Sequence, residues 1–405
     1  MDSFADTIAE ETGRYLALWS ETPAAFPVAL RRFSASARVE KEREVEILLE
    51  KTIPRLDRYG EMEDGERERY LGRAHTALGR LMTGEGDPVV NRFFEECESA
   101  GKLFVRRARE HDPGLSDDDI HQALRNQWVF NSIQSSLSRP VTLTSASLGY
   151  SLMYPCTDNL LDAGSRTHDE KIRFNRSLAS CLEGNAAEVD PADLRGFPAL
   201  LEMIEEEYPR EEFPDVYRSL RAIHRAQQKS LLLHANVEEH PEAFLQSLTI
   251  EKGGASVVVD GVLVAGTLAP GPLHALFGYG VVLQFIDDLQ DIPQDAAAEH
   301  STMFTRASRS GLLDEITGRL MHFTCGTTRL LDGVSHSSGG PLSGLVQGSC
   351  IFLILEAVAR YRHLYSPPFL EAVEEFSPLR FSYLGGLHGR VRTALAAREH
   401  SFFPA

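Results

Sequence analysis

Cysteine is scarce in this chain, and positive charge is in deficit. Five of the 405 residues are cysteine, without the paired spacing of a disulfide framework or a thiolate zinc site, so we expect reduced, mostly buried thiols. Lysine and arginine number 41 against 59 aspartate and glutamate, a formal net charge of −18. Because such a chain would repel a polyanionic backbone, we expect no nucleic-acid partner.

Targeting and membrane signals are also missing from the sequence. It begins Met-Asp-Ser-Phe-Ala-Asp, without the basic head and apolar run of a secretory signal, so we expect a cytoplasmic protein. The most apolar stretch, 253–292, is interrupted by Asp260, Pro270 and His274. It leaves no clean run of about 20 apolar residues, which favours buried core elements over a transmembrane segment.

Strand signals are nearly absent too. The one good candidate is the valine-rich stretch 257–264, which by local chemistry forms a short hairpin around an Asp-Gly pair. Elsewhere apolar residues recur at three- and four-residue intervals, as in the window 39–56, a pattern typical of amphipathic helices. We therefore expect an all-α fold, with an N-terminal segment at residues 1–35 and one all-α domain at 36–405.

An acidic pair, Asp158 and Asp162, lies in an otherwise uncharged helical window at 141–163. Residues four apart differ by about 40° around a helix axis, so both carboxylates project from one face. Arg166 follows four residues after Asp162 and pairs with it if the helix continues that far. A solvated acidic face is the alternative, but the uncharged surroundings favour a carboxylate clamp.

A second acidic pair, Asp287 and Asp291, lies in the still more apolar window 272–291. Mutual repulsion in a low-dielectric interior raises carboxyl pKa values or recruits cations. Oxygen ligands without histidine or cysteine select a hard divalent ion such as Mg²⁺. Asp288 is a further, less favoured candidate metal ligand. Gln284, one turn before it, is a candidate to hydrogen-bond the groups around the metal site.

A lysine precedes two glycines at Lys252-Gly253-Gly254. An ammonium at the mouth of an apolar segment can meet phosphate oxygens, and the glycines permit close approach. Taken alone, the pattern is more often a helix terminus with its C-cap, and that alternative stays open. Two facing carboxylate clamps make sense if their metal ions bridge to a polyphosphate, because bare carboxylates would repel an anionic substrate.

The order of these three elements resembles the class I isoprenoid synthase superfamily, over roughly residues 140–310. Residues 284–291 resemble the second Asp-rich motif of chain-elongating prenyl diphosphate synthases, Gln-x-x-Asp-Asp-x-x-Asp. Asp158-Asn159-Leu160-Leu161-Asp162 is closer to the first motif of squalene and phytoene synthases and of bacterial large-terpene synthases. Leu263-Val264-Ala265-Gly266 keeps the end of the Tyr-x-x-x-Val-Ala-Gly-type element of head-to-head synthases but lacks its tyrosine, which makes squalene-type coupling less favoured.

The resemblance implies a single-domain helical bundle of the class I isoprenoid synthase type, with 255–267 helical rather than a hairpin. In that superfamily two Asp-rich motifs face each other and bind three Mg²⁺ ions with a prenyl diphosphate. The implied metal ligands and catalytic residues are Asp158, Asp162, Asp287 and Asp291, with Asp288 as a further ligand. The implied substrate-binding residues are Lys252, Gln284, Asn159 and Arg166.

The implied reaction is that of a Mg²⁺-dependent terpene synthase, which ionises a prenyl diphosphate to an allylic carbocation and releases pyrophosphate. A prenyltransferase, chain-elongating or head-to-head, is the second interpretation, and a non-catalytic helical protein that binds prenyl lipids is the third. Phe277, Tyr279 and Phe285 are candidate aromatic faces for the cation, although core packing is commoner for such residues. Pro293 is expected to break the helix before Asp295. A homodimer is plausible on the number of apolar helices, and the motifs do not specify the chain length or the product.

Overall fold

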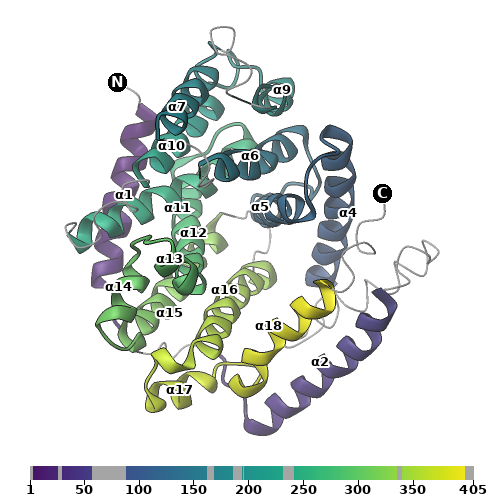
Figure 1. The fold of residues 1–405 in the computed structure, drawn as a ribbon, viewed down its shortest axis with the longest axis vertical. Helices are drawn as coiled ribbons and strands as arrows, with labels where there is room; N and C mark the ends of the chain where they lie inside the picture. The colour runs from purple at the N-terminus through teal and green to yellow at the C-terminus, as the bar shows by residue number, and fades with distance from the viewer. Residues whose placement is uncertain are drawn as a thin grey trace. The chain divides into compact units, whose positions relative to one another are not determined.

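The computed structural model describes residues 3–25, 30–56, 88–161, 168–185, 194, 196–230, 241–334 and 340–396. Every regular element in these ranges is a helix, and no strand occurs in them, so the all-α prediction is confirmed. The helices, labelled in Figure 1, are α1 (Ser3–Glu21), α2 (Ala35–Leu56), α4 (Pro88–His111), α5 (Asp117–Ser136), α6 (Ser145–Leu161), α7 (His168–Leu182), α9 (Phe197–Glu207), α10 (Pro214–Ser230), α11 (Glu242–Ala265), α12 (Pro270–Gln290), α13 (Ile292–Ala297), α14 (Met303–Ser310), α15 (Asp314–Thr328), the 3₁₀ helix η4 (Arg329–Gly333), α16 (Gly340–Arg360), the 3₁₀ helix η5 (Arg362–Leu364), α17 (Pro367–Glu374) and α18 (Phe381–Ala396).

The valine-rich stretch 257–264 is helical, and the hairpin suggested by its local chemistry is wrong. It belongs to α11, which runs without a break through Gly253 and Gly254. All residues from Val257 to Leu263 are buried, including Asp260 between the valines. Tertiary burial on every side of the helix outweighs the strand preference of valine, which is a weak and context-dependent tendency.

The N-terminal segment contains a helix that the sequence analysis did not anticipate. Ile8, Tyr15 and Trp19 of α1 are at most 3% exposed, at spacings that return to one helical face. Charged residues between them, such as Glu10 and Arg14, make the segment look like a surface helix until its apolar partners are known. The boundary proposed at residue 35 stays a prediction.

Contacts divide the chain into two compact units. The first comprises Met1–Ala17, Glu96–Gln284 and Leu331–Ser337. Within it α10 packs on α11, α6 packs on α9 and α5, and α5 also contacts α11. Tyr208, just after α9, donates a hydrogen bond of 2.8 Å from its hydroxyl to the carbonyl oxygen of Leu263. This unit therefore has α11 as a buried central helix.

The second unit comprises Leu18–Glu95, Phe285–Leu330 and Ser338–Ala405. Its α15 and α18 both pack on α16. Residues of α2 are tied to α18 by charge: Glu46 lies 2.7 Å from the guanidinium of Arg390, and Glu42, 5% exposed, pairs with Arg380 just before α18. A buried carboxylate with an arginine partner is a satisfied structural group, so these acids are not candidate metal ligands.

The four cysteines whose side chains the structure describes are free thiols, as predicted. Cys181, Cys325 and Cys350 are buried, whereas Cys97 is half-buried. Burial raises the pKa of the Cys350 thiol to about 12 and that of Cys325 to about 11. These side chains therefore act as small apolar core residues rather than nucleophiles.

Helix α16 is apolar and long enough to cross a membrane by length and composition. The window is Ser343–Arg360, and half of it is buried inside the protein. Glu356 within it forms an ion pair of 2.6 Å with Arg360. A single window of this kind is weak support for a membrane span, because core helices pass the same test.

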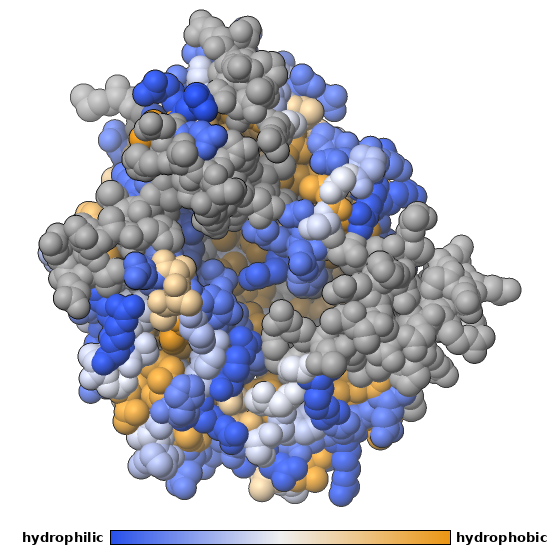
Figure 2. Space-filling model, viewed as in Figure 1, coloured by the Kyte–Doolittle hydropathy of each residue, from blue (hydrophilic) through white to orange (hydrophobic). Residues whose placement is uncertain are grey.

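Apolar side chains on the surface are dispersed. Figure 2 shows one face on which hydrophilic residues predominate among the described atoms, with hydrophobic residues in separate small groups. The most exposed large apolar residues, Leu312, Trp128 and Ile47, lie on or near three different helices. Scattered residues of this kind are normal for a protein surface. The homodimer therefore stays a prediction.

Candidate active site

The second acidic pair lies at the C-terminal end of α12. The amide of Asp291 donates to the carbonyl oxygen of Asp287 at 2.9 Å, so the helical path continues for one turn and both residues lie on one side, as predicted. Both are half-buried, whereas Asp288 is 5% exposed. The preceding Phe285 is fully buried. The carboxylates therefore form the polar end of an otherwise apolar helix.

Pro293 breaks the helix where the sequence predicted. Helix α12 ends at Gln290, and α13 begins with Pro293 in its first turn, where the missing N–H of proline costs little. Asp295 of α13 lies 3.2 Å from Nδ1 of His300. Because Asp295 has this local partner beyond the break, we leave it out of the proposed ligand set.

Tyr361, between α16 and η5, holds the end of α12. Its hydroxyl donates a 2.5 Å hydrogen bond to the carbonyl oxygen of Gln290, one of the carbonyls that the end of a helix leaves without a partner. The sequence analysis missed this residue, because 71 positions separate the two partners and no local pattern marks the contact. Tyr361 is thus a candidate positioning residue for Asp287 and Asp291.

Two glycines bring α11 and α12 into backbone contact. A Cβ on Gly280 would lie 2.1 Å from the carbonyl oxygen of Gly253, and a Cβ on Gly253 would lie 2.6 Å from the Cβ of Gln284. Only glycine permits such an approach. Lys252 directly precedes this contact on α11, and Gln284 takes part in it on α12, one turn before Asp288. The structure thus places Lys252 and Gln284 on adjoining segments.

Lys252 lies inside α11, so its interpretation as a helix terminus with a C-cap is wrong. The glycines after it serve helix contact: a Cβ on Gly254 would lie 2.3 Å from the ring of Phe277. Lys252 is half-buried. Its neighbour Glu251 pairs at 2.6 Å with Lys229, a surface lysine at the end of α10. Of these two lysines, Lys252 fits an anion-binding role better, because Lys229 already has a carboxylate partner.

Two of the aromatic candidates for cation stabilisation are core residues. Phe277 is fully buried and its ring centroid lies 5.5 Å from that of Tyr15. Phe285 is also fully buried, with ring centroids 4.7 Å from Trp19 and 5.7 Å from Phe323. Both rings are enclosed by other side chains, as the commoner role of such residues anticipates.

The first acidic pair falls largely outside the described part of the chain. Asp158 and Asn159 lie in the last turns of α6, and their side chains are not among those described. Asp162 and Arg166 lie outside the described residues. That the two acidic pairs face each other therefore stays a prediction.

A buried polar cluster joins α5, α6 and α11. The side-chain amide of Asn126 donates to Oδ1 of Asp260 at 3.4 Å and to Oγ of Ser151 at 3.3 Å. Asp260 is 1% exposed and Ser151 fully buried. Desolvation raises the pKa of the Asp260 carboxyl well above its ordinary value, and the Asn126 hydrogen bond offsets only part of this.

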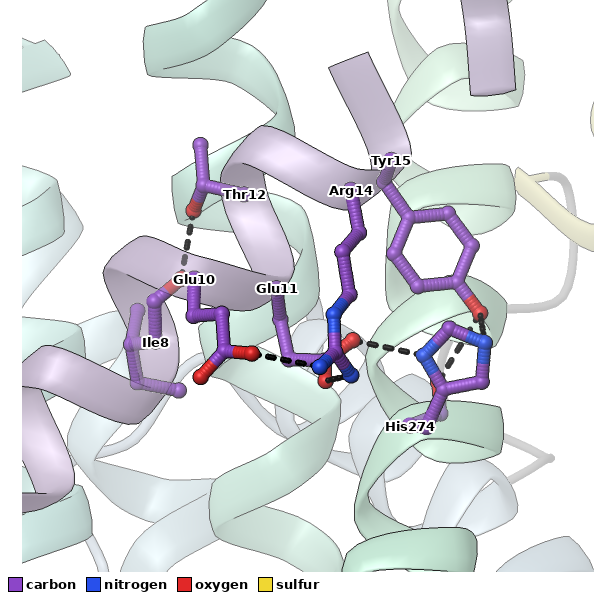
Figure 3. A network of polar contacts seen from close by, with 7 residues as sticks. All are labelled: Ile8, Glu10, Glu11, Thr12, Arg14, Tyr15 and His274. Carbon is purple, nitrogen blue, oxygen red and sulfur yellow. Dashed lines mark hydrogen bonds and ion pairs between the residues drawn. The ribbon is translucent and has the colours of Figure 1, made fainter. Parts of the chain in front are cut away.

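Helix α1 braces the N-terminal part of α12 (Figure 3). The hydroxyl of Tyr15 donates to the carbonyl oxygen of His274 at 2.9 Å, and Oε2 of Glu11 lies 2.6 Å from Nδ1 of the same histidine. Arg14 donates a 2.8 Å bond to the other oxygen of Glu11. Burial, followed by the nearby Glu11 charge, raises the pKa of Tyr15. The Tyr15 hydroxyl is therefore a neutral hydrogen-bond donor that fixes α12 in place.

The donor set at and just after the end of α12 has the chemistry that Mg²⁺ prefers. Asp287, Asp288 and Asp291 supply only oxygen, within little more than one helical turn. Among the described residues no group of three or more histidine, cysteine, aspartate or glutamate side chains is close enough to hold a metal ion. The other half of the predicted ligand set, Asp158 and Asp162, is outside that search. The donor types thus fit the ion, and the complete ligand set stays a prediction.

No protein-family model matches the sequence, and no curated protein matches it either. Among solved structures, the chain is similar to a crystal structure of polyprenyl synthase from Caulobacter crescentus CB15 complexed with calcium and isoprenyl diphosphate. The alignment covers 87% of this chain and 98% of that one, at 16% identity and a TM-score of 0.25.

Proposed function

We propose that this protein is a Mg²⁺-dependent enzyme that ionises a prenyl diphosphate and releases pyrophosphate, and that it acts as a terpene synthase. The observation that carries the proposal is the glycine contact between α11 and α12, which brings Gly253, directly after Lys252, against Gln284, in the helix that carries Asp287 and Asp288. A lysine suits the oxygens of a diphosphate, and a group of aspartates suits the ions that accompany it.

In this proposal each group has a separate task. Lys252 donates to diphosphate oxygens, and Gln284 hydrogen-bonds to the same anion. Asp287 and Asp291, with Asp158 and Asp162 opposite, would hold Mg²⁺, which neutralises charge on the leaving diphosphate. Tyr361 keeps the end of α12 in register, and α1 fixes its beginning through Tyr15. The apolar helices exclude water, which would otherwise quench a carbocation.

The direct test is pyrophosphate release. Purified protein with Mg²⁺ is incubated with dimethylallyl, geranyl, farnesyl, geranylgeranyl and longer prenyl diphosphates, and products are identified by mass spectrometry. A hydrocarbon or alcohol from one substrate supports the terpene synthase. A requirement for isopentenyl diphosphate, or dimerisation of one substrate, supports the prenyltransferase instead. Binding of a prenyl diphosphate without any pyrophosphate release would support the third interpretation, a non-catalytic protein that binds prenyl lipids.

Asp287→Ala and Asp158→Ala test the assigned residues. Each is expected to lower turnover by roughly two orders of magnitude or more, since each removes a charge needed to hold the ions. Asp332→Ala, a change of an aspartate in η4, serves as the control and should leave turnover unchanged. Circular dichroism verifies that the helical fold is retained. Full activity in both variants would refute the assignment.

A further inference from the structure

Helix α10 has a cationic side to which the proposed mechanism gives no task. Its sequence contains four basic residues and one acid: Arg218, Arg221, Arg225 and Lys229 against Asp215. The chain as a whole has the opposite balance, with a net charge of −18. The three arginines recur at three- and four-residue intervals, so they project from one side of the helix. We call these three residues the arginine stripe.

The arginine stripe is open to solvent. Arg225 is exposed and Arg221 is half-buried, and the side chain of Arg218 is 40% exposed. The other side of the helix packs on α11 and carries buried residues such as Val216 and Ile223, which are at most 5% exposed. An anion can therefore approach the stripe from solvent, without a cavity in the protein.

The positive charge of the stripe is only partly cancelled on α10. Arg218 lies 3.0 Å from Asp215, the single acid of this helix. Nε of Arg221 has no hydrogen-bond partner among the described residues. Within α10, the stripe thus has three positive charges against one negative charge, and the excess lies toward the C-terminal end of the helix.

That end of α10 lies against the turn of α11 that contains Lys252. Lys229 follows Arg225 by four residues, about 6 Å along the axis. Its Nζ lies 2.6 Å and 2.9 Å from the two carboxylate oxygens of Glu251, and Glu251 directly precedes Lys252 in the sequence. The stripe therefore leads toward the lysine to which we assign the diphosphate, and the Lys229–Glu251 pair joins the two helices there.

We propose that the arginine stripe guides the diphosphate group of an incoming substrate along α10 to Lys252. This inference rests on the proposed function. A protein with a large negative charge repels an anionic substrate, whereas a local positive surface raises the concentration of the anion beside the site and speeds its association. The stripe acts on the diphosphate and not on the prenyl chain, so it serves short and long substrates alike.

The test compares native protein with the double variant Arg221→Gln/Arg225→Gln in steady-state pyrophosphate release. At an ionic strength near 0.01 M, where charges interact over about 30 Å, we expect kcat/KM to fall by roughly three- to tenfold. At about 1 M salt, where that length is about 3 Å, the two proteins should agree within about twofold. The loss should be the same for geranyl and geranylgeranyl diphosphates, and kcat should not change.

Two further variants separate the position of the charges from their number. Arg106→Gln/Arg107→Gln removes two arginines from α4, whose side chains are 68% and 58% exposed. It makes the same change in net charge and should leave kcat/KM native. Gln228→Lys adds a positive charge at an exposed position of α10 and should raise kcat/KM by roughly twofold at low ionic strength alone. This gain does not depend on whether the double variant folds well.

The outcomes distinguish this inference from the function on which it rests. Native protein that releases no pyrophosphate from any prenyl diphosphate would refute both. Native turnover, with the same kcat/KM in the α10 double variant at low ionic strength, would refute the inference alone. An equal loss in the α4 double variant would refute it too, because net charge would then explain the effect. A loss that persists in 1 M salt would indicate a structural role, and a loss seen only with phosphatidylserine vesicles would assign the stripe to a membrane surface instead.

Discussion

The backbones of Gly253 and Gly280 touch, and this contact sets the distance between α11 and α12. A Cβ on Gly280 would lie 2.1 Å from the Gly253 carbonyl oxygen and 2.9 Å from its carbonyl carbon. Both obstacles are backbone atoms, which cannot rotate away as a side chain would. The position of Lys252 relative to Gln284 on α12 thus depends on two residues without side chains.

Gly280→Ala should force the two helices apart. We expect the free energy of unfolding to fall by about 1–3 kcal/mol or more, because the added methyl group overpacks a contact between main chains. Urea denaturation measures the change. Gly271→Ala, in the first turn of α12 with open space around it, is the matched control and should be neutral or slightly stabilising. Equal stability of the two variants would contradict the close approach.

Lys252→Met tests the proposed anion contact. Removing a charge-assisted hydrogen bond of about 1.5–3 kcal/mol should raise KM for the prenyl diphosphate by roughly 10- to 100-fold. Lys229→Met, which breaks the exposed pair with Glu251 on the neighbouring segment, should change KM less than about threefold. Steady-state pyrophosphate release gives both values. If the two variants behave alike, Lys252 does not bind the diphosphate.

Tyr361→Phe tests whether the end of α12 is held for metal binding. Loss of the 2.5 Å bond to the Gln290 carbonyl should cost about 1 kcal/mol and raise the Mg²⁺ concentration for half-maximal activity by several-fold. Tyr365→Phe is the control: its hydroxyl lies 3.1 Å from Thr317 Oγ1, on α15 rather than α12. The expectation is contradicted if both variants show the native Mg²⁺ dependence.

His224 should make the protein less stable in mild acid. Burial lowers the pKa of its imidazole from 6.5 to about 4, so between these values the unfolded chain binds a proton that the folded protein does not. Stability attributable to His224 is therefore complete above pH 6.5 and is lost as pH falls, by roughly 3 kcal/mol at pH 4.

Urea titrations at several pH values measure this dependence. Asp260, whose pKa is raised, contributes in the opposite sense, with stability lost as pH rises above the unfolded value. The informative quantity is therefore the difference in unfolding free energy between native protein and His224→Phe as a function of pH. The same difference, measured for the exposed control His363→Phe, should not change with pH. A pH profile unaltered by His224→Phe would show that the histidine is not buried in its neutral form.

Local sequence patterns predicted a residue's position correctly where that position depends only on the residue's own helix. The pairing of Asp287 with Asp291 on one side of α12 follows from four-residue spacing, and the break at Pro293 follows from the chemistry of proline. The continuous helix through Gly253 was harder to predict from the sequence, because a Gly-Gly pair locally indicates a helix break. The close approach of α12 explains why glycine occurs there.

Contacts between distant segments could not be anticipated in this way. Tyr361 meets Gln290 across 71 residues, and Tyr15 of α1 meets His274 of α12 across 259. Asp260 was hidden by its surroundings, since an Asp-Gly pair between valines signals a turn. Its burial by α5 and α6 is a tertiary fact that single-sequence spacing does not contain.

The pairing of α1 with α12 also has a consequence for biosynthesis. Tyr15 hydrogen-bonds to His274 across 259 positions, so its partner leaves the ribosome roughly 13 to 52 seconds later at about 5–20 residues per second. Throughout that interval the apolar side chains of Tyr15 and Trp19 have no α12 residues to pack against. The beginning of α12 is therefore fixed by α1 only after most of the chain has been made.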